Sequence, residues 1–424
     1  MNIEEIYKIY RQYPSIQTDS RKIEKDDIFF ALKGPNFNGN QFAEQALNAG
    51  AAYVVADEFV GVEDERIIHV NDVLKTLQQV AKFHREQFSI PFIAITGSNG
   101  KTTTKELLHA VLSTTYKTYT TKGNLNNHIG IPLTILKIKG DAEIAVIEMG
   151  ANHQHEIEGY CQYAEPTHGL ITNIGKAHLE GFGGEEGVKK GKGELFDYLK
   201  KNNGTIFVNT DDVAVFDLSK PISNLIFYGS KSEDANGIIV QNDPFIEIKI
   251  EDKNPFTIQT NLVGSYNLAN VLAAVCVGKY FKIDVAKIKN AIENYYPSNS
   301  RSQLIRKDSN SIILDAYNAN PGSMKAAIEN FAKMKGDKKI LLLGSMMELG
   351  TDSRKEHEAI ISLIGQHKWN AVVLVGKNFN EIKNNFINFE NAEQAKGWLK
   401  DQKFKNAQLL VKGSRSMQME KVLE

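Results

Sequence analysis

The sequence predicts an α/β protein of three domains, which we place at residues 1–88, 89–297 and 298–424. The chain of 424 residues is long for a single domain. Apolar, strand-like runs alternate with helical patterns along most of it, which is the order that a largely parallel sheet requires. In the middle region a glycine-containing loop joins such a strand to such a helix, as in folds that bind nucleotides.

The first domain is expected to be small, with strands at 27–32 and 52–56 and helices at 41–48 and 73–87. Ser20, Arg21 and Lys33 lie in the polar segments between these elements. Asn, Gly and Pro in the same segments are typical of turns. The segments are therefore either turns alone or an anion and sugar site that uses Arg21 and Lys33.

The second domain opens with PFIAITGSNGKTTTKE at 91–106. A strand pattern at 92–95 leads into the glycines, and a helical pattern follows at 103–113. This order places backbone N–H groups, a helix N-terminus, an ammonium and a hydroxyl around one point. That combination can hold a polyphosphate and its Mg²⁺. The glycines are closer together than in the usual P-loop, and a glycine turn can be purely structural, but the following Lys-Thr-Thr-Thr favours phosphate. The expected nucleotide contacts are Gly97, Ser98, Asn99, Gly100, Lys101, Thr102 and Thr103.

Further polar residues follow the strands of this domain. Glu148 ends a strand pattern at 143–149, and His178 follows another at 169–174. Ligands of open α/β sheets bind outside the carboxyl ends of the strands, so Glu148 is expected to share a Mg²⁺ with Thr102 rather than form a structural ion pair. His178 is either a ligand or an ordinary histidine. Asn126 and Asn127 belong to a loop too polar for a core, which is either a stiff connection or a ligand loop.

The rest of the second domain is expected to contain a helix beginning near Lys189, Lys190 and Lys192, whose lysines could simply form a solvated face. Short alternating strands at 245–250 and 256–262 predict an antiparallel excursion within 222–262, followed by a helix at 266–280. Residues 297–300 read as a linker. The third domain, of Rossmann-like α/β type, is expected to have strands at 311–316, 339–343, 371–375 and 408–412 and helices at 323–335, 353–365 and 392–400.

Composition excludes several classes of protein. The formal net charge of −1 gives no electrostatic reason to bind nucleic acid or an anionic membrane surface. Two distant cysteines provide neither a disulfide framework nor a metal motif. The N-terminal residues lack a secretory signal, and the longest apolar runs are too short to span a bilayer. We therefore expect a cytoplasmic protein without membrane insertion.

Taken together, the motifs resemble the Mur ligase family, and the resemblance extends over all three domains. The phosphate loop at 96–106 shows the short glycine spacing of that family. The other matching segments are TDSR at 18–21, FFALKGPNFNG at 29–39, GNLNNHIGIPLTIL at 123–136, EMG at 148–150, NIGKAHLEGFG at 173–183, GSYNLANVLAA at 264–274, DAYNANPGSM at 315–324 and LGSMMELG at 343–350.

The resemblance implies an ATP-dependent ligase that joins D-alanyl-D-alanine to the terminal carboxylate of UDP-N-acetylmuramoyl-tripeptide through an acyl phosphate, in peptidoglycan synthesis, with the chain acting as a monomer. The alternative is the sister ligase that adds a diamino acid to the dipeptide precursor. That enzyme usually carries a DNPR-like motif, which this chain lacks. A folylpolyglutamate-type ligase would share the phosphate loop but not the first domain. A nucleotide-dependent switch or a silent binding module would not need Glu148, His178 and a lysine on one sheet edge.

The resemblance also implies residue roles. Lys101 would contact the β and γ phosphates, Thr102 and Glu148 the first Mg²⁺, and His178 with Glu148 a second. Lys192 would be carbamylated and so become an anionic ligand, with Lys189 and Lys190 as alternatives. The remaining contacts are Asn267 for adenine; Arg301, Asp315 and Asn318 for ATP; Ser20, Arg21 and Lys33 for the uridine diphosphate; Asn126 and Asn127 along the substrate; and Glu348 near D-alanyl-D-alanine.

Overall fold

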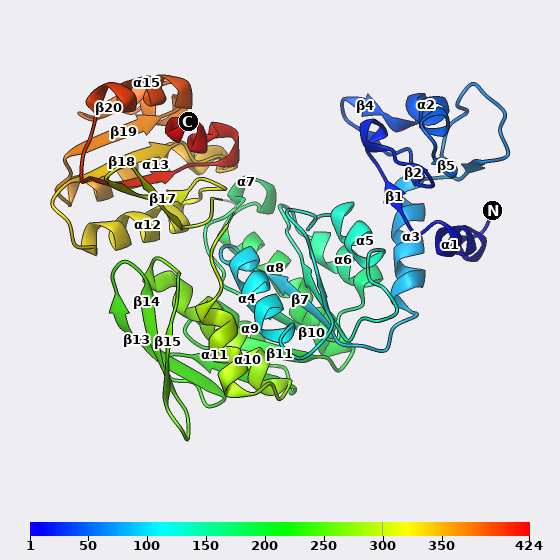
Figure 1. The fold of residues 1–424 in the computed structure, drawn as a ribbon, viewed down its shortest axis with the longest axis horizontal. Coiled ribbons are helices and arrows are strands. Elements are labelled where there is room, and N and C mark those ends of the chain that lie inside the picture. Colours follow the sequence, from blue (N-terminus) through cyan, green and yellow to red (C-terminus); the bar gives the residue numbers. More distant parts are fainter. Residues whose placement is uncertain (299) are drawn as a thin grey trace.

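The computed structural model describes residues 1–298 and 300–424, which form three α/β units in chain order (Figure 1). The N-terminal unit lies at one end of the molecule and the C-terminal unit at the other, with the largest sheet between them. The predicted three-part α/β architecture is therefore present.

The N-terminal unit contains a four-stranded parallel sheet in the order β1-β2-β5-β6. A two-stranded antiparallel ribbon, β3 with β4, follows β2. Apolar residues of β2 and β5 are fully buried, which explains why these two strands were visible in the sequence. The elements of this unit are α1 Ile3–Gln12, β1 Ile16–Gln17, β2 Ile28–Phe30, β3 Lys33–Gly34, β4 Phe37–Asn38, α2 Ala43–Asn48, β5 Tyr53–Ala56, β6 Ile67–His69 and α3 Val73–Arg85.

The central unit is organised around a nine-stranded sheet in the order β15-β14-β13-β12-β11-β10-β7-β9-β8. The strand β7 lies between β9 and β10 and is parallel to both, so the loops after all three strands reach the same edge. This is the edge at which open α/β sheets bind ligands. The strands are β7 Phe92–Thr96, β8 Thr118–Thr120, β9 Ile144–Glu148, β10 His168–Ile171, β11 Thr205–Asn209, β12 Leu225–Gly229, β13 Ala235–Asn242, β14 Ile246–Glu251 and β15 Phe256–Gln259.

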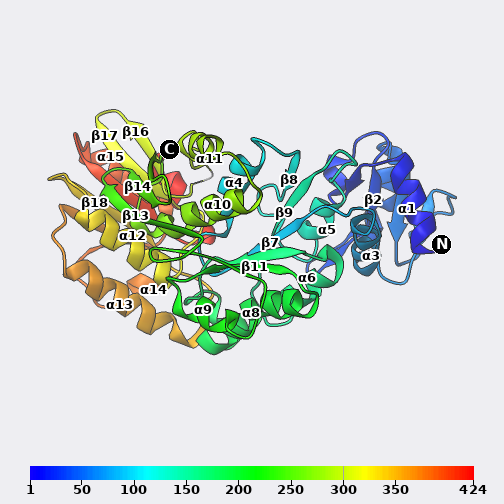
Figure 2. The ribbon, with the colours of Figure 1, turned by 90° about the horizontal axis from the view of Figure 1, so that it is seen from below.

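Helices cover both faces of this sheet (Figure 2). One face packs against α4, α10 and α11, whose apolar side chains form one cluster with Ile93 and Ile95 of β7. The other face packs against α6 and α8, in a cluster that contains Phe92 and Ala94. Successive residues of β7 therefore serve opposite cores, as expected for a central strand. The helices are α4 Lys101–Leu112, α5 Gly130–Ile135, α6 Glu156–Ala164, α7 Leu179–Phe182, α8 Glu185–Lys201, α9 Val213–Ser219, α10 Leu268–Tyr280 and α11 Val285–Glu293.

The C-terminal unit has a six-stranded sheet in the order β16-β17-β21-β18-β19-β20, with only β16 antiparallel to its neighbour. Its helix α12 begins with Pro321 after an Asn320 cap, whose side chain accepts from the N–H of Ser323. The elements are β16 Gln303–Lys307, β17 Asn310–Asp315, α12 Pro321–Lys333, β18 Lys339–Gly344, α13 Ser353–Gly365, β19 Ala371–Val375, α14 Lys377–Asn380, β20 Ile387–Phe389, α15 Ala392–Gln402 and β21 Gln408–Lys412.

Three expectations need correction. The antiparallel part of 222–262 begins only at β13, because β12 returns parallel to β11 after the crossover helix α9. The helix after the phosphate loop starts at Lys101 rather than Thr103, directly after the left-handed Gly100. The strand expected at 169–174 leaves the sheet after Ile171 because the next residues bond to the phosphate loop, where the carbonyl of Asn173 accepts from the N–H of Ser98. Of the expected linker 297–300, Asn299 lies outside the described residues.

Helix α3 fastens the N-terminal unit to the central one. The guanidinium of Arg85 donates to the carbonyls of Ala164 and Glu165 at the end of α6 and lies 3.9 Å from the ring centroid of Phe92 in β7. His84 binds the carbonyl of Ile138 at 2.8 Å. None of the helices in the described part of the chain is both long and apolar enough to cross a bilayer.

Candidate functional site

The phosphate loop joins β7 to α4, and its glycines are required by the backbone. Gly97 and Gly100 have φ values of +142° and +82°. A Cβ atom on Gly97 would lie 2.0 Å from Thr172 Oγ1, and one on Gly100 would lie 2.6 Å from Asn270 Oδ1. The loop is thus tightly enclosed between the segment after β10 and the start of α10, with the N-terminus of α4 open to an anion.

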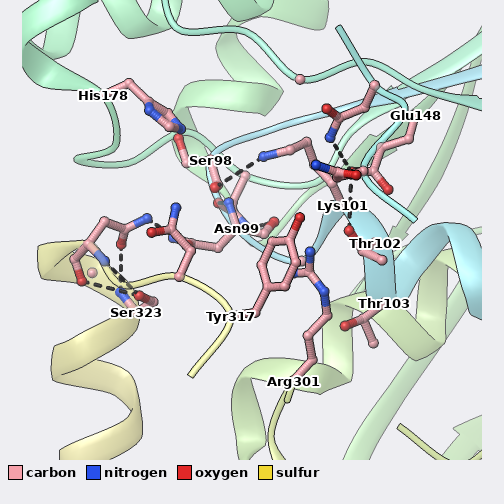
Figure 3. A pocket seen from close by; sticks show the side chains of 18 of the residues that line it. Ser98, Asn99, Lys101, Thr102, Thr103, Glu148, His178, Arg301, Tyr317 and Ser323 are labelled. Carbon is pink, nitrogen blue, oxygen red and sulfur yellow. Dashed lines mark hydrogen bonds between the residues drawn. The ribbon is translucent and has the colours of Figure 1, made fainter. Parts of the chain in front are cut away.

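Lys101, the first residue of α4, lies across this loop. Its Nζ donates to the carbonyl of Gly97 at 2.7 Å and to that of Ser98 at 3.4 Å, and Figure 3 shows the side chain beside Ser98. Burial lowers the pKa of Lys101 to about 8, while the nearby Glu148 carboxylate acts in the opposite direction. An anionic phosphate at the loop would supply the countercharge that the ammonium lacks.

Glu148, the last residue of β9, is 1% exposed and lies beside the loop. One carboxylate oxygen, Oε1, accepts from Thr102 Oγ1 at 3.1 Å and from Asn126 Nδ2 at 2.8 Å. The other, Oε2, is buried and has no hydrogen-bond partner. A buried carboxylate oxygen without a partner is costly, and oxygen is the ligand that Mg²⁺ prefers. The Glu148 and Thr102 oxygens therefore suit a divalent cation.

His178 lies on the opposite side of Lys101 from Glu148 in the close view (Figure 3). Its Nδ1 is 2.6 Å from Glu348 Oε2 of the C-terminal unit, within ion-pair range but outside the geometry of a hydrogen bond. This contact lowers the pKa of Glu348. The residue expected near D-alanyl-D-alanine thus lies against a residue expected at a metal.

Lys192 differs from the other two candidate lysines of α8. It is completely buried, whereas Lys189 is half-buried and Lys190 is exposed. Its Nζ donates to the carbonyl of Ala151 at 3.0 Å and lies 4.9 Å from the ring centroid of Phe182. Burial, with a smaller contribution from Lys101, lowers the pKa of Lys192 well below its usual value. A neutral amine is the form that reacts with carbon dioxide, so the structure suits carbamylation at Lys192.

The C-terminal unit forms the opposite wall. The guanidinium carbon of Arg301 lies 3.7 Å from the ring centroid of Tyr317, and its Nε is buried without a partner. Asp315 accepts from Lys412 Nζ at 2.5 Å and from the N–H of Ser302 at 3.0 Å. Two basic groups therefore lie at the cavity, one stacked and one paired, where an anionic nucleotide would pass.

Asparagines join the two walls. Asn320 Nδ2 donates to Asn99 Oδ1 of the phosphate loop at 2.8 Å, although the residues are 221 positions apart. On the central unit, Asn267 is 3% exposed and donates to the carbonyl of Val263 while accepting from Asn270. Asn270 also accepts from Thr104 Oγ1 of α4. The region expected to hold adenine is thereby tied to the helix that follows the phosphate loop.

Most of these residues surround one cavity of about 530 Å³ between the central and C-terminal units, whereas Gly97, Lys192 and Glu348 are not among the residues that line it. Among the described residues, no three His, Cys, Asp or Glu side chains gather as a ready-made cation site, because the expected set draws on a threonine and a modified lysine as well. Of the residues expected at the site, those that line the cavity are Ser98, Asn99, Gly100, Lys101, Thr102, Thr103, Asn126, Asn127, Glu148, His178, Asn267, Arg301, Asp315 and Asn318.

The candidates of the N-terminal unit are not among the cavity residues. Arg21 forms a bidentate pair with Asp19 in the short helix Ser20–Lys22. Lys33 Nζ lies 3.1 Å from Asp57 and 3.2 Å from Glu58. Figure 1 places this unit beyond α5 and α6, away from the C-terminal unit. A substrate that touches both regions must therefore be extended.

Several residues of the cavity were missed from the sequence. Tyr317, Asn320 and Lys412 act through partners that are distant in the chain, and no local pattern marks such pairs. Asn320 alone carried a signal, since an asparagine before a proline suggests a helix cap. Lys105, 1% exposed, donates to the carbonyl of Thr121 beneath Glu148 and was read only as a helical residue.

Fold and site together define an enzyme that uses a nucleoside triphosphate at the edge of a parallel sheet. Family models match almost the whole chain: the Mur ligase family catalytic domain at residues 12–86, the Mur ligase middle domain at 95–278 and the Mur ligase glutamate ligase domain at 300–415. The chain belongs to the Mur ligase family, whose members the sequence motifs resembled. It is an ATP-dependent ligase.

Individual relatives show which members of the family the chain is similar to. The chain is 35% identical to a UDP-N-acetylmuramoyl-tripeptide–D-alanyl-D-alanine ligase of Bacillus subtilis, over 96% of this chain and 92% of the relative. A crystal structure of MurF from Acinetobacter baumannii superposes with a TM-score of 0.88 at 29% identity, and that of MurF from Thermotoga maritima with ADP gives 0.86 at 28%; both cover 96% of this chain and 92% and 96% of theirs, respectively.

Proposed function

We propose that this enzyme joins D-alanyl-D-alanine to the terminal carboxylate of a UDP-N-acetylmuramoyl-tripeptide, with ATP as the source of energy. The similarity to ligases named for this reaction, over nearly the full length of the chain, carries the proposal. The sister ligase that adds a diamino acid is not favoured, because the relatives are named as ligases of D-alanyl-D-alanine.

The chemistry requires activation of a carboxylate. Hydroxide is a poor leaving group, so the terminal carboxylate first attacks the γ-phosphorus of ATP, and the bond to the bridging oxygen of ADP breaks. The acyl phosphate formed is then attacked by the amine of D-alanyl-D-alanine. The tetrahedral intermediate expels phosphate, and the amine loses its proton to give the peptide bond. The protein's contribution is positioning and neutralisation of charge.

Residues of the phosphate loop supply that contribution. The N–H groups at the start of α4 and the Lys101 ammonium neutralise the β and γ phosphates, and Lys101 exchanges its carbonyl contacts in the loop for phosphate oxygens. From the other wall, Arg301, Asp315 and Asn318 would contact ATP. The buried Asn267 would contact adenine.

The site also fits Mg²⁺. Glu148 and Thr102 would hold one ion, and Glu148, His178 and a carbamate on Lys192 a second. Bound Mg²⁺ would neutralise charge on the transferring phosphoryl group. The carbamate forms when the neutral Lys192 amine attacks carbon dioxide and loses a proton, which turns a cation that would repel the metal into an anionic oxygen ligand.

The two ends of the precursor would lie in different units. Ser20, Arg21 and Lys33 would hold the uridine diphosphate, and Lys33 would exchange Asp57 or Glu58 for phosphate oxygens. Asn126 and Asn127 would contact the peptide near the phosphate loop. We further propose that the enzyme acts as a monomer in the cytoplasm. Sedimentation velocity tests the monomer.

Phosphate release from ATP tests the function. Release should require both a UDP-muramoyl-tripeptide and D-alanyl-D-alanine, and mass spectrometry should detect the pentapeptide product. Parallel reactions with diaminopimelate-containing and lysine-containing tripeptides identify the accepted third residue. Hydrolysis of ATP without the amine would favour a nucleotide-dependent switch, and ligation of a free diamino acid to the dipeptide precursor would favour the sister enzyme.

A further inference from the structure

The segment after β10 is held by the C-terminal unit through two side chains. Lys176 Nζ lies 2.7 Å from Glu356 Oε1 of α13, and His178 Nδ1 lies 2.6 Å from Glu348 Oε2. The same segment contributes His178 to the nucleotide cavity. One short stretch of chain therefore contacts both the cavity and the opposite domain.

The Lys176 pair lies at the domain boundary and is shielded from water on the Glu356 side, while the Lys176 side chain is 37% exposed and also lies 3.5 Å from Glu185 of α8. Glu356 is 7% exposed, so its carboxylate is nearly removed from water and requires a cation nearby. Lys176 meets this need across 180 positions of the chain. If the two units separated, the Glu356 carboxylate would lose the Lys176 ammonium and would have to be solvated by water instead.

The backbone next to these pairs is also closely fitted. The N–H of Glu180, in α7, approaches the carbonyl of Glu348 at 3.4 Å. Gly350 has a φ of +53°, and a Cβ atom there would lie 3.2 Å from the Cβ of Glu180. Figure 1 shows α7 beside the C-terminal unit, while its Phe182 also packs against α8 of the central unit. The backbones of α7 and of the segment around Gly350 therefore also fit closely where these side chains meet.

We propose that Glu348 and Glu356 are positioning residues: by docking onto His178 and Lys176, they set the orientation of the His178 ring at the nucleotide cavity. With Nδ1 2.6 Å from a carboxylate, Nε2 is the nitrogen left to bind a ligand, and the negative charge of Glu348 favours the proton on Nδ1. The inference rests on the proposed function for the reaction served. If the inference holds, cation binding in the central unit depends on contact with the C-terminal unit, which would present the incoming amine.

A charge exchange across the Lys176 pair tests the docking. K176E and E356K should each weaken Mn²⁺ binding in the presence of a non-hydrolysable ATP analogue, measured by electron paramagnetic resonance, and lower kcat, both by about 10- to 100-fold. The double variant K176E/E356K should recover most of both losses. The matched control is K377E/E381K, which exchanges an exposed pair between the first residue of α14 and the residue after its end, and should change neither quantity.

E348Q tests the histidine contact without threatening the fold, because the Glu348 side chain is 51% exposed. It should lower Mn²⁺ affinity about 10-fold with little change in thermal unfolding. Unchanged Mn²⁺ affinity in E348Q, or losses in the charge-exchange pair that simply add, would overturn the inference. The proposed function is tested separately, by ligation of D-alanyl-D-alanine with the wild-type enzyme. If the wild type ligates and the variants bind Mn²⁺ normally, the positioning role is wrong while the proposed function stands.

Discussion

Replacement of Lys192 separates its proposed chemical role from its structural one. Lys192→Met keeps a long apolar stem beside Phe182 and loses one hydrogen bond to Ala151, a cost of about 1 kcal/mol in the free energy of unfolding. Lys192→Ala additionally removes three buried methylene groups, about 2.4 kcal/mol at ~0.8 kcal/mol each. Burial favours the neutral amine in the folded state, whereas the unfolded chain binds a proton there at neutral pH. Both replacements therefore also remove a destabilising contribution, and these values are upper limits.

These values convert to melting temperatures. For a unit of 150–250 residues, about 1 kcal/mol lowers Tm by roughly 2–4 °C. Lys192→Met should therefore lose at most about 2–4 °C, and Lys192→Ala, at about 3.4 kcal/mol, at most about 7–14 °C. Both should lose at least about 100-fold in kcat, the upper range for residues that tune a metal site. Differential scanning fluorimetry and coupled phosphate release measure the two effects.

Added formate distinguishes the carbamate from a simple packing role. The space left in Lys192→Ala can admit a short carboxylate, which would replace the lost anionic oxygens, whereas the methionine side chain of Lys192→Met fills that space. Formate should therefore restore part of the activity of the alanine variant only. Lys190→Ala, an exposed change on the same helix, is the control. Full activity of Lys192→Ala would refute the carbamate role. Restoration of activity by formate in Lys189→Ala rather than in Lys192→Ala would assign that role to Lys189.

Three further predictions concern other parts of the chain. Lys101→Ala should abolish turnover with Tm unchanged within about 1 °C, because this partly buried ammonium gives the fold little; normal turnover in a phosphate-release assay would contradict its role. Asn320→Ala should cost about 1 kcal/mol in urea unfolding through the lost helix cap and raise KM for ATP through the lost Asn99 contact, and an unchanged KM would separate the two roles. Burial lowers the pKa of His168 to about 4, so the unfolded chain takes up a proton there below about pH 6.5 and the folded chain does not. The free energy of unfolding should consequently fall as the pH drops from about 6.5 to about 4, and a His168→Gln variant should show a flatter profile in urea titrations at stepped pH.

Local sequence patterns predicted the elements around the site because each of them is buried in a regular way. The strand β7, every residue of which is buried, and the Gly-Lys-Thr run after it are continuous in the chain, so their joint geometry follows from the order of residues. The same holds for Glu148 at the end of β9. The strands β19 and β21 and the helix α13 begin and end where the sequence indicated.

Contacts between units could not be predicted in this way. The pair His178–Glu348 joins two units, and its geometry depends on how their sheets are placed relative to each other. The pair Asp315–Lys412 lies within the C-terminal sheet, but it joins β17 to β21, whose residue comes 97 positions later in the chain. Short strands such as β16, which is half exposed, lack the apolar run that marks a buried strand. The motif resemblance supplied roles for several of these residues, but the pairing partners came from the structure alone.

The attachment of α3 through Arg85 has a consequence for which precursors the enzyme accepts. That arginine ties the end of α3 to Ala164, Glu165 and the first residue of β7, the strand that leads into the phosphate loop. Under the proposed function, a precursor held at its uridine end by Lys33 would have to reach the triphosphate at Lys101 across the distance that this attachment maintains. A precursor shorter by one residue would then not bring its terminal carboxylate to the γ-phosphorus.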